Sequence, residues 1–269
     1  MAAEGGLNLV RKSVRVLDLL AERGEATAAE LADDLGEPRS SVYRLLASLQ
    51  ALDMVEQGPR KGRYRLGIRL VRLGSAVIER FDERNSAVPV MERIHAETGE
   101  TVFLCVRRDM DAVCIERLAG RRVQSLALKL GGSLPLHAGA GPRALLAFES
   151  RDMWAQYLAE REPLEKMTPS TPVTADALLS VLEETRRTGL SISDQDVTIG
   201  IAALGVPILD YQGHVRAALS ISGVREAILG EDTERIRRLL VEGGREISRA
   251  LGWREPEERK PEDEATSSA

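Results

Sequence analysis

The chain has 269 residues, 43% of them hydrophobic, and a formal net charge of -5, which suffices for a small domain and a larger one with its own core. It has no apolar run near the roughly 18 residues that a membrane helix needs and no apolar signal core, so we expect a cytoplasmic protein with no membrane partner. Two cysteines without a Cys-x-x-Cys motif and three scattered histidines exclude zinc modules of the usual spacing, and we expect neither a metal nor a cofactor.

The first predicted element is a helix from about Leu7 to Glu22, followed by Gly24, which is suited to end it. Its apolar positions recur at helical spacing and are Val10, Val14, Leu17 and Leu20. We expect this helix to support the pair of helices that comes next.

Residues 27–52 predict two short helices joined by a tight turn. Thr27 and Glu30 have the spacing of a capping box, in which each side chain binds the backbone N–H of the other residue. Gly36 suits the end of the first helix and Pro38 the first turn of the second, so three residues form the corner. The second helix has an apolar stripe that must be buried. Its members are Val42, Leu45, Leu46, Leu49 and Leu52.

The opposite face of this second helix carries hydroxyl groups and cations but no carboxylate. Such a face suits phosphate oxygens and base edges in the major groove of DNA. Its members are Arg39, Ser40, Ser41, Tyr43, Arg44 and Ser48. An ordinary solvated helix face is the alternative, because short polar helices after such a corner also occur in proteins that never bind nucleic acid.

A strand, a turn at Gly58-Pro59 and a returning strand predict a β-hairpin, or wing, after this helix. Its tip carries Arg60, Lys61 and Arg63. The segment from Gly58 to Ile78 has six basic residues and no acidic one. Residues 1–84 carry 14 Lys and Arg against 13 Asp and Glu, whereas the rest of the chain carries 23 against 29. Only the first part is therefore suited to double-stranded DNA, although winged helices also serve as protein-interaction modules.

Residues 67–84 predict a linking helix, because the stretch from Ile68 to Arg84 has no glycine or proline except Gly74. Apolar residues recur along it at near-heptad spacing and are Leu70, Leu73, Val77 and Phe81. This seam either meets a partner chain or packs on its own domain, since barely two heptads do not decide between the two.

Beyond the linking helix a further helix is predicted over residues 88–96, and then the apolar period changes from 3.6 to 2, which predicts an α+β domain with an antiparallel sheet. The expected strands are 101–107, 112–117, 123–130, 190–192, 201–209 and 215–222. The expected helices are 143–148, a helical region over 151–187 and a closing helix over 231–251. The tail 254–269 is rich in proline and charge, and we expect it to be disordered.

The turn centred between Asp109 and Met110 predicts that Cys105 and Cys114 lie opposite each other on neighbouring strands. Two explanations remain open. The thiols form a redox switch, or they are small core residues that stay reduced in the cytosol.

With these elements in place, the chain resembles the IclR family of bacterial transcriptional regulators. The resemblance spans residues 8–252 and is carried by RLLASLQALDMVE, YRLGIRLVRLG, GETVFLCVRRDMDAVCIERLAG, LPLHAGAGPRALLAF and ALSISG. It implies a winged helix-turn-helix domain (7–66), the linking helix (67–84) and a GAF-like effector-binding and oligomerisation domain (85–253). It also implies homodimers or dimers of dimers on pseudo-palindromic operators.

The resemblance further implies a small-molecule pocket formed by His137, Gly139, Ala140, Gly141, Ser193, Asp194, Ala203, Ser220 and Ser222. The glycines around Ala140 leave backbone N–H groups at a helix N-terminus, which favours an anion. A plain N-terminal turn whose amides bind water is the alternative. Ser193 and Ala203 stand where relatives that bind small keto acids often have an acidic residue and a cysteine, so we expect a less polar site.

We therefore expect a DNA-binding regulator controlled by a carboxylate-bearing molecule with an apolar or aromatic body, and we expect glyoxylate and pyruvate to bind poorly. The chain lacks a G-x-S-x-G elbow, an H-E-x-x-H motif and a P-loop, so an enzyme is not expected.

Overall fold

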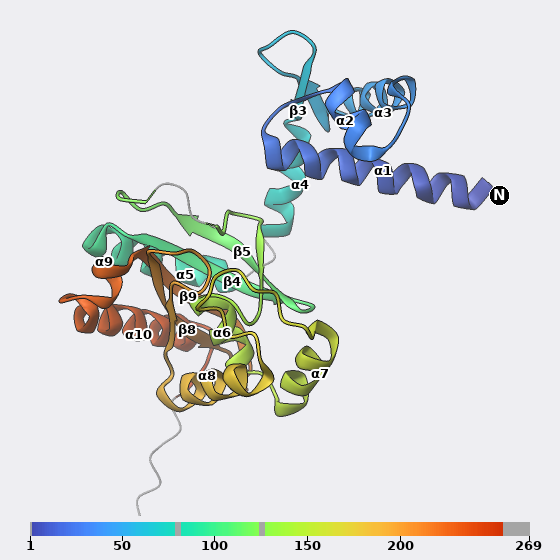
Figure 1. Cartoon of the computed structure of the whole chain (residues 1–269). Coiled ribbons are helices and arrows are strands. Elements are labelled where there is room, and N and C mark those ends of the chain that lie inside the picture. The colour runs from blue at the N-terminus through green and yellow to red at the C-terminus, as the bar shows by residue number, and fades with distance from the viewer. Residues whose placement is uncertain (1, 79–81, 124–126, 255–269) are drawn as a thin grey trace, which may run out of the picture. The chain divides into compact units, whose positions relative to one another are not determined.

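The structure is a computed structural model that describes residues 2–78, 82–123 and 127–254. The chain forms two compact units, Met1–Arg80 and Phe81–Ala269, and each has its own hydrophobic core (Figure 1). Among the described helices, none has the combination of length and apolarity that a membrane span requires.

The N-terminal unit combines helices with a small antiparallel sheet. The helices are α1 (Ala2–Arg23), α2 (Ala28–Leu35), α3 (Arg39–Ala51) and α4 (Arg69–Ile78). The strands are β1 (Ala26–Thr27), β2 (Val55–Gln57) and β3 (Arg63–Leu66), in the order β1-β3-β2. The predicted linking helix thus corresponds to α4 and the start of α5 (Asp82–Thr98), while its residues 79–81 lie outside the described part.

The local signals between α2 and α3 are confirmed. The Glu30 N–H donates to Thr27 Oγ1 at 3.2 Å, and the Thr27 N–H donates to Glu30 Oε2 at 2.7 Å, which completes the capping box. Gly36 ends α2 with φ of 63°, a left-handed conformation that glycine adopts without a steric penalty. α2 and α3 are joined by residues 36–38, as predicted.

One predicted apolar position in this unit is wrong, and the apolar residues of α1 are buried only in part. Leu52 is 50% exposed because α3 ends at Ala51, so only the other four residues of the stripe are buried. Val10 and Val14 are 59% and 51% exposed. Of the four apolar residues that indicated this helix, Leu20 is buried and Leu17 is partly buried, and Val16 and Leu19 complete the face of α1 that joins the core of the unit.

The C-terminal unit is built around a six-stranded antiparallel sheet of order β6-β5-β4-β9-β8-β7. Its strands are β4 (Thr101–Arg108), β5 (Asp111–Leu118), β6 (Ser133–Pro135), β7 (Ser191–Asp194), β8 (Ile201–Leu209) and β9 (Val215–Val224). Its helices are α5, α6 (Ala140–Ala147), α7 (Arg151–Arg161), α8 (Ala175–Thr188), α9 (Arg225–Leu229) and α10 (Thr233–Ala250).

The strands alternate between two cores, one on each face of this sheet. Val102 and Leu104 join the core formed with α5 and α10, whereas Phe103 and Cys105 join the core formed with α6, α7 and α8. α10 continues through Gly244 without a break. The missing side chain of Gly244 lets this helix lie close to the sheet. An added Cβ there would lie 2.6 Å from the Val206 side chain.

The third strand of the predicted meander is displaced along the chain. Residues 123 and 127–130 are not in a strand, residues 124–126 lie outside the described part, and β6 occupies Ser133–Pro135. β6 is an edge strand, where the missing N–H of Pro135 costs no ladder hydrogen bond. Just before β6, Gly131 and Gly132 pair with β5, since the Gly131 N–H donates to the Cys114 carbonyl at 2.8 Å and the Cys114 N–H donates to the Gly132 carbonyl at 3.0 Å.

The cross-strand pairing of Cys105 with Cys114 is confirmed. Both side chains are buried and neither forms a disulfide. The hydrogen bond with Cys114 and burial both raise the pKa of the Cys105 thiol. Both effects favour the uncharged, unreactive form of Cys105.

Candidate functional site

The outer face of α3 is open to solvent over most of its length. Arg39, Ser40, Arg44 and Ser48 are exposed, and Tyr43 is 55% exposed. Ser41 is half-buried in a hollow between α1 and α3. The Ser48 hydroxyl donates to the Arg44 carbonyl at 3.0 Å. Within the described residues neither Arg39 nor Arg44 forms an ion pair, so both guanidinium groups are available to an external anion.

The wing is less cationic than its sequence suggests, because acidic residues of the wing itself and of the segment before α2 pair with its arginines. Arg60 is 3.2 Å from Glu25, and Arg65 is 2.6 Å from Glu56. Lys61 at the tip is exposed and makes no ion pair in the described part of the chain. Lys61 is therefore the wing cation best placed to contact a phosphate.

Arg63 is engaged inside the N-terminal unit. Its guanidinium lies 3.2 Å from Glu30 and 3.6 Å from Glu25, and it also donates to the Glu25 carbonyl at 3.2 Å. Glu30 is the capping-box residue of α2, and its pKa is lowered mainly by the hydrogen bonds with Thr27. Arg63 thus ties the base of the wing to the start of α2.

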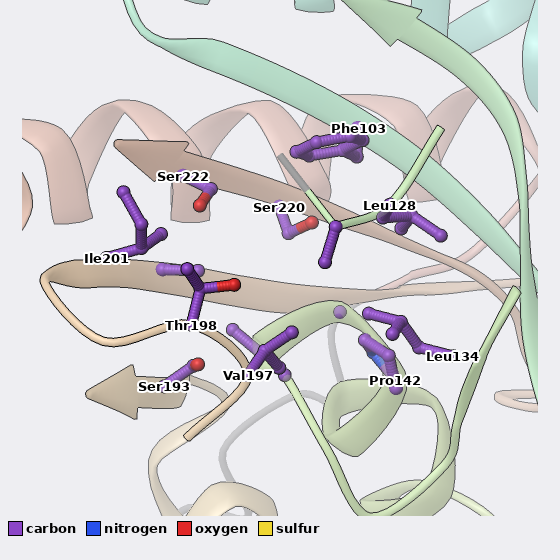
Figure 2. A pocket seen from close by; sticks show the side chains of 15 residues that line it. Phe103, Leu128, Leu134, Pro142, Ser193, Val197, Thr198, Ile201, Ser220 and Ser222 are labelled. Atoms are coloured by element: carbon purple, nitrogen blue, oxygen red, sulfur yellow. The ribbon is translucent and has the colours of Figure 1, made fainter. Parts of the chain in front are cut away.

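In the C-terminal unit a pocket of about 490 Å³, including its open mouth, lies between the sheet and the N-terminus of α6 (Figure 2). Figure 2 shows Ser220 and Ser222 across the pocket from Ser193 and Val197. The lining is mainly apolar and includes Phe103, Ala127, Leu128, Leu134, Pro142, Val197, Thr198 and Ile201. An apolar lining with a few polar groups is typical of small-molecule sites.

The pocket brings together seven of the nine residues that the family resemblance implies. They are Gly139, Ala140, Gly141, Ser193, Ala203, Ser220 and Ser222. His137 and Asp194 do not line it. Sequence reasoning missed the apolar wall, although Phe103, Leu134 and Pro142 lie in stretches that carry the family resemblance.

His137 is buried and belongs to the scaffold behind the pocket. Its Nε2 lies 2.8 Å from the Glu165 carbonyl, which only accepts hydrogen bonds, so Nε2 carries the hydrogen and Nδ1 accepts one from the Tyr157 hydroxyl at 2.7 Å. Burial lowers the pKa of His137 and raises the pKa of Tyr157 to about 12. His137 is therefore a neutral group that fixes the segment around Glu165.

Asp194 and Asp196 have different partners. Asp194 forms a two-fold hydrogen-bonded ion pair with Arg225 at 2.7 and 2.9 Å, and both side chains are 41% exposed. Asp196 forms an ion pair with Arg143 of α6, and both side chains are only 3% exposed. The second carboxylate oxygen of Asp196 accepts a hydrogen bond from Ser193, a residue of the pocket wall. Sequence reasoning missed this buried pair, although a charged residue inside the apolar run of α6 was a signal.

The N-terminus of α6 lies directly on the sheet because Gly205 has no side chain. An added Cβ on Gly205 would lie 2.6 Å from the Ala140 carbonyl carbon and 2.9 Å from the Gly141 nitrogen. The N–H groups in the first turn of a helix have no hydrogen-bond partner within the helix. In the described part of the chain no side chain caps α6, so these N–H groups receive no hydrogen bond from a cap. They are suited to bind an anion at this end of the pocket.

Comparison with known proteins gives two family matches that together cover most of the chain. The model for the IclR helix-turn-helix domain matches residues 9–59, and the model for the bacterial transcriptional regulator IclR C-terminal domain matches residues 75–249. The chain belongs to the IclR family. The two units are its helix-turn-helix domain and its C-terminal domain.

Relatives in the IclR family are named as regulators and not as enzymes. The transcriptional regulator XynR of Escherichia coli K12 is 29% identical over 245 residues, 91% of this chain and 97% of XynR. The repressor AllR of the same strain is 31% identical over 252 residues, 93% of this chain and 92% of AllR.

Two solved IclR structures cover nearly the whole chain. The Thermotoga maritima IclR has a TM-score of 0.78 at 30% identity, over 92% of this chain and all of that one. An IclR homologue from Microbacterium hydrocarbonoxydans, solved in complex with 4-hydroxybenzoate, has a TM-score of 0.79 at 27% identity, over 91% of this chain and 99% of that one.

Proposed function

We propose that this regulator binds a DNA operator through α3 and the wing, and that a small carboxylate-bearing molecule in the C-terminal pocket changes its affinity for that operator. The observation that carries the proposal is the pocket itself. It has an apolar wall, an uncapped helix N-terminus at one end, and a place in the same chain as a helix-turn-helix unit.

The ligand is an acid with an apolar or aromatic body. Among the residues that the structure describes, none that lines the pocket is a cation, so charge recognition rests on the backbone amides of α6. The phenyl ring of Phe103 and the aliphatic side chains around it favour a ring or alkyl body over the short keto acids glyoxylate and pyruvate. The 4-hydroxybenzoate complex of the Microbacterium homologue is consistent with this class.

On the DNA side, Ser40, Tyr43 and Arg44 enter the major groove and Lys61 contacts a phosphate. Ser41, Arg39, Ser48 and Arg60 flank this contact, and we assign Arg63 to holding the wing rather than to DNA. We expect a homodimer or a dimer of dimers on a pseudo-palindromic operator, acting in the cytoplasm. The exposed Val71 and Leu73 of α4 offer apolar surface for a second copy.

Calorimetric titration of the full chain with benzoate, glyoxylate and pyruvate tests the ligand class. We expect benzoate to bind more tightly than either keto acid. Tight binding of the keto acids together with no heat from benzoate would overturn this assignment of the pocket.

The alternative is a winged-helix module that contacts protein and not DNA. Salt dependence separates the two functions, because neutralising several phosphates makes DNA affinity fall steeply as salt rises. Retention on duplex DNA that is weak and insensitive to salt would favour the alternative.

A further inference from the structure

Two of the serines in the pocket have hydroxyl hydrogens that point away from it. The Ser193 hydroxyl is bonded to the Asp196 carboxylate, and the Ser222 hydroxyl is bonded to the Ala202 carbonyl at 3.1 Å. A carboxylate and a carbonyl only accept hydrogen bonds, so each serine must be the donor in its pair. Each serine oxygen therefore has only lone pairs left for the pocket.

The buried ion pair fixes this direction at Ser193. Asp196 and Arg143 are only 2% and 3% exposed, and they form an ion pair in which the Arg143 guanidinium donates to one carboxylate oxygen of Asp196. The carboxylate of this ion pair accepts hydrogen bonds and donates none. If Ser193 turned its hydroxyl hydrogen into the pocket, the buried Asp196 carboxylate would lose that hydrogen bond. Such a loss is costly, which makes Ser193 a fixed acceptor.

The sheet register places these acceptors at one end of the pocket and the α6 amides at the other. Ser193, Ala203 and Ser222 lie in one cross-strand row. The N-terminus of α6 lies over the next row on the same face, because Gly205 contacts Ala140 and pairs with Ser220. Two residues along a strand separate the rows by about 7 Å, so a single small molecule spans both ends.

We propose that the pocket selects acids that carry a hydrogen-bond donor, a hydroxyl or an amino group, at the end opposite the carboxylate. The inference rests on the proposed effector function and specifies its ligand class. The carboxylate lies against the α6 amides, since at the serine end it would face two acceptors. The donor at the far end binds Ser193 or Ser222. Thr198 also lines the pocket, and its rotatable hydroxyl serves either role without removing the two fixed acceptors.

Four acids that share one ring test the proposal: benzoate and its 4-hydroxy, 4-amino and 4-methoxy derivatives. The measurement is calorimetric titration of the full chain. We expect the hydroxy and amino acids to bind at least tenfold more tightly than benzoate and 4-methoxybenzoate, because a methoxy oxygen only accepts and leaves the serine acceptors unpaired.

Serine-to-alanine variants locate the effect. In the double variant Ser193→Ala/Ser222→Ala we expect the four affinities to converge to within threefold. Ser191→Ala is the matched control, since Ser191 is a buried serine of the same strand and face but does not line the pocket. We expect it to keep the tenfold preference. If the double variant does not fold, the two single variants Ser222→Ala and Ser193→Ala replace it. Ser222→Ala leaves the Arg143–Asp196 ion pair intact. At least one of the two must lose the tenfold preference for acids that carry a donor.

The outcomes separate this inference from the proposed function. Binding of all four acids with equal affinity, or of 4-methoxybenzoate as tightly as 4-hydroxybenzoate, overturns the donor requirement and leaves the effector function standing. No binding of any of the four acids overturns the acid ligand class, and the donor requirement falls with it.

Discussion

Helix α3, which we propose binds DNA, and helix α6, whose N-terminus borders the pocket, each carry arginine, but in opposite settings. Arg39 and Arg44 of α3 are exposed and make no ion pair in the described part of the chain, whereas Arg143 of α6 is buried and paired with Asp196. An exposed cation without a partner attracts a polyanion from outside. A buried, paired cation is unavailable to ligands and instead sets the hydrogen-bonding direction of its neighbours. In the proposed function, the same type of side chain therefore serves recognition in one unit and preorganisation in the other.

The largest expected effect comes from breaking the buried pair. Asp196→Ala leaves Arg143 buried without a counterion, and we expect a loss of about 3 to 5 kcal/mol in the free energy of unfolding of the C-terminal unit. Asp194→Ala is the matched control, since it removes a half-exposed pair, and its loss should be about 0 to 1 kcal/mol. Urea denaturation measures both. Equal losses for the two variants would mean that the Arg143 pair is not buried in solution.

Removing the exposed cation should affect DNA recognition and not stability. We expect Arg44→Ala to cost about 1 to 3 kcal/mol of binding free energy at one base pair and to relax the preference there. Binding to a library of duplexes selected from random sequence provides the measurement. An Arg44→Ala protein with the affinity and base preference of the parent would show that α3 does not read DNA through this residue.

The two wing cations should differ from each other. Lys61→Ala should weaken binding to all sequences alike and reduce the slope of log affinity against log salt by about 0.9, the value for one phosphate contact. Arg63→Ala should instead lower the melting temperature of the N-terminal unit, because Arg63 bonds Glu25 and Glu30. The assignment would be contradicted if Arg63→Ala changed the salt slope of DNA binding and Lys61→Ala lowered the melting temperature.

Acid should weaken the C-terminal unit through His137. Burial lowers the pKa of His137 below 6.5, so the unfolded chain binds a proton that the folded chain does not. The contribution to stability is complete above pH 6.5 and is lost as the pH falls toward the lower pKa of the folded state. The midpoints of urea denaturation at pH 7.5 and pH 5.5 measure this loss of stability. The difference between the two midpoints should be smaller in His137→Gln. The exposed His214 is the control, and His214→Gln should retain the full loss.

The smallest expected effect is that of oxidation. Cys105 and Cys114 are buried, and the raised pKa of Cys105 keeps its thiol protonated. We expect the same DNA affinity after treatment with hydrogen peroxide and with dithiothreitol. A change in affinity that is lost in Cys114→Ala would support the redox switch.

Features set by near neighbours in the chain were predictable from sequence. The capping box of Thr27 and Glu30, the glycine stop at Gly36 and the facing of Cys105 and Cys114 follow from spacing alone. The cap and the stop each depend on a few consecutive residues, and the facing of the two cysteines depends on where the turn between their strands is centred. That is why these local predictions are confirmed.

Features set by residues far apart in the chain were not predictable. Val10 and Val14 fit a helical period, but which face of α1 is buried depends on where α2 and the sheet lie. The Arg143–Asp196 pair joins residues 53 positions apart, and nothing in the sequence marks Asp196 rather than Asp194 as its partner. The strand expected over 123–130 is replaced by β6 at Ser133–Pro135, because an edge strand tolerates a proline that a local strand pattern disfavours.

The central claim is that a ligand in the C-terminal pocket controls DNA binding by the N-terminal unit. The most direct measurement is the affinity of the full chain for a duplex selected from genomic fragments, with and without saturating 4-hydroxybenzoate. We expect a change of roughly 5- to 150-fold, with the duplex changing the affinity for 4-hydroxybenzoate by the same factor, as linkage requires. Calorimetrically proven binding of 4-hydroxybenzoate with no change in DNA affinity would contradict the claim.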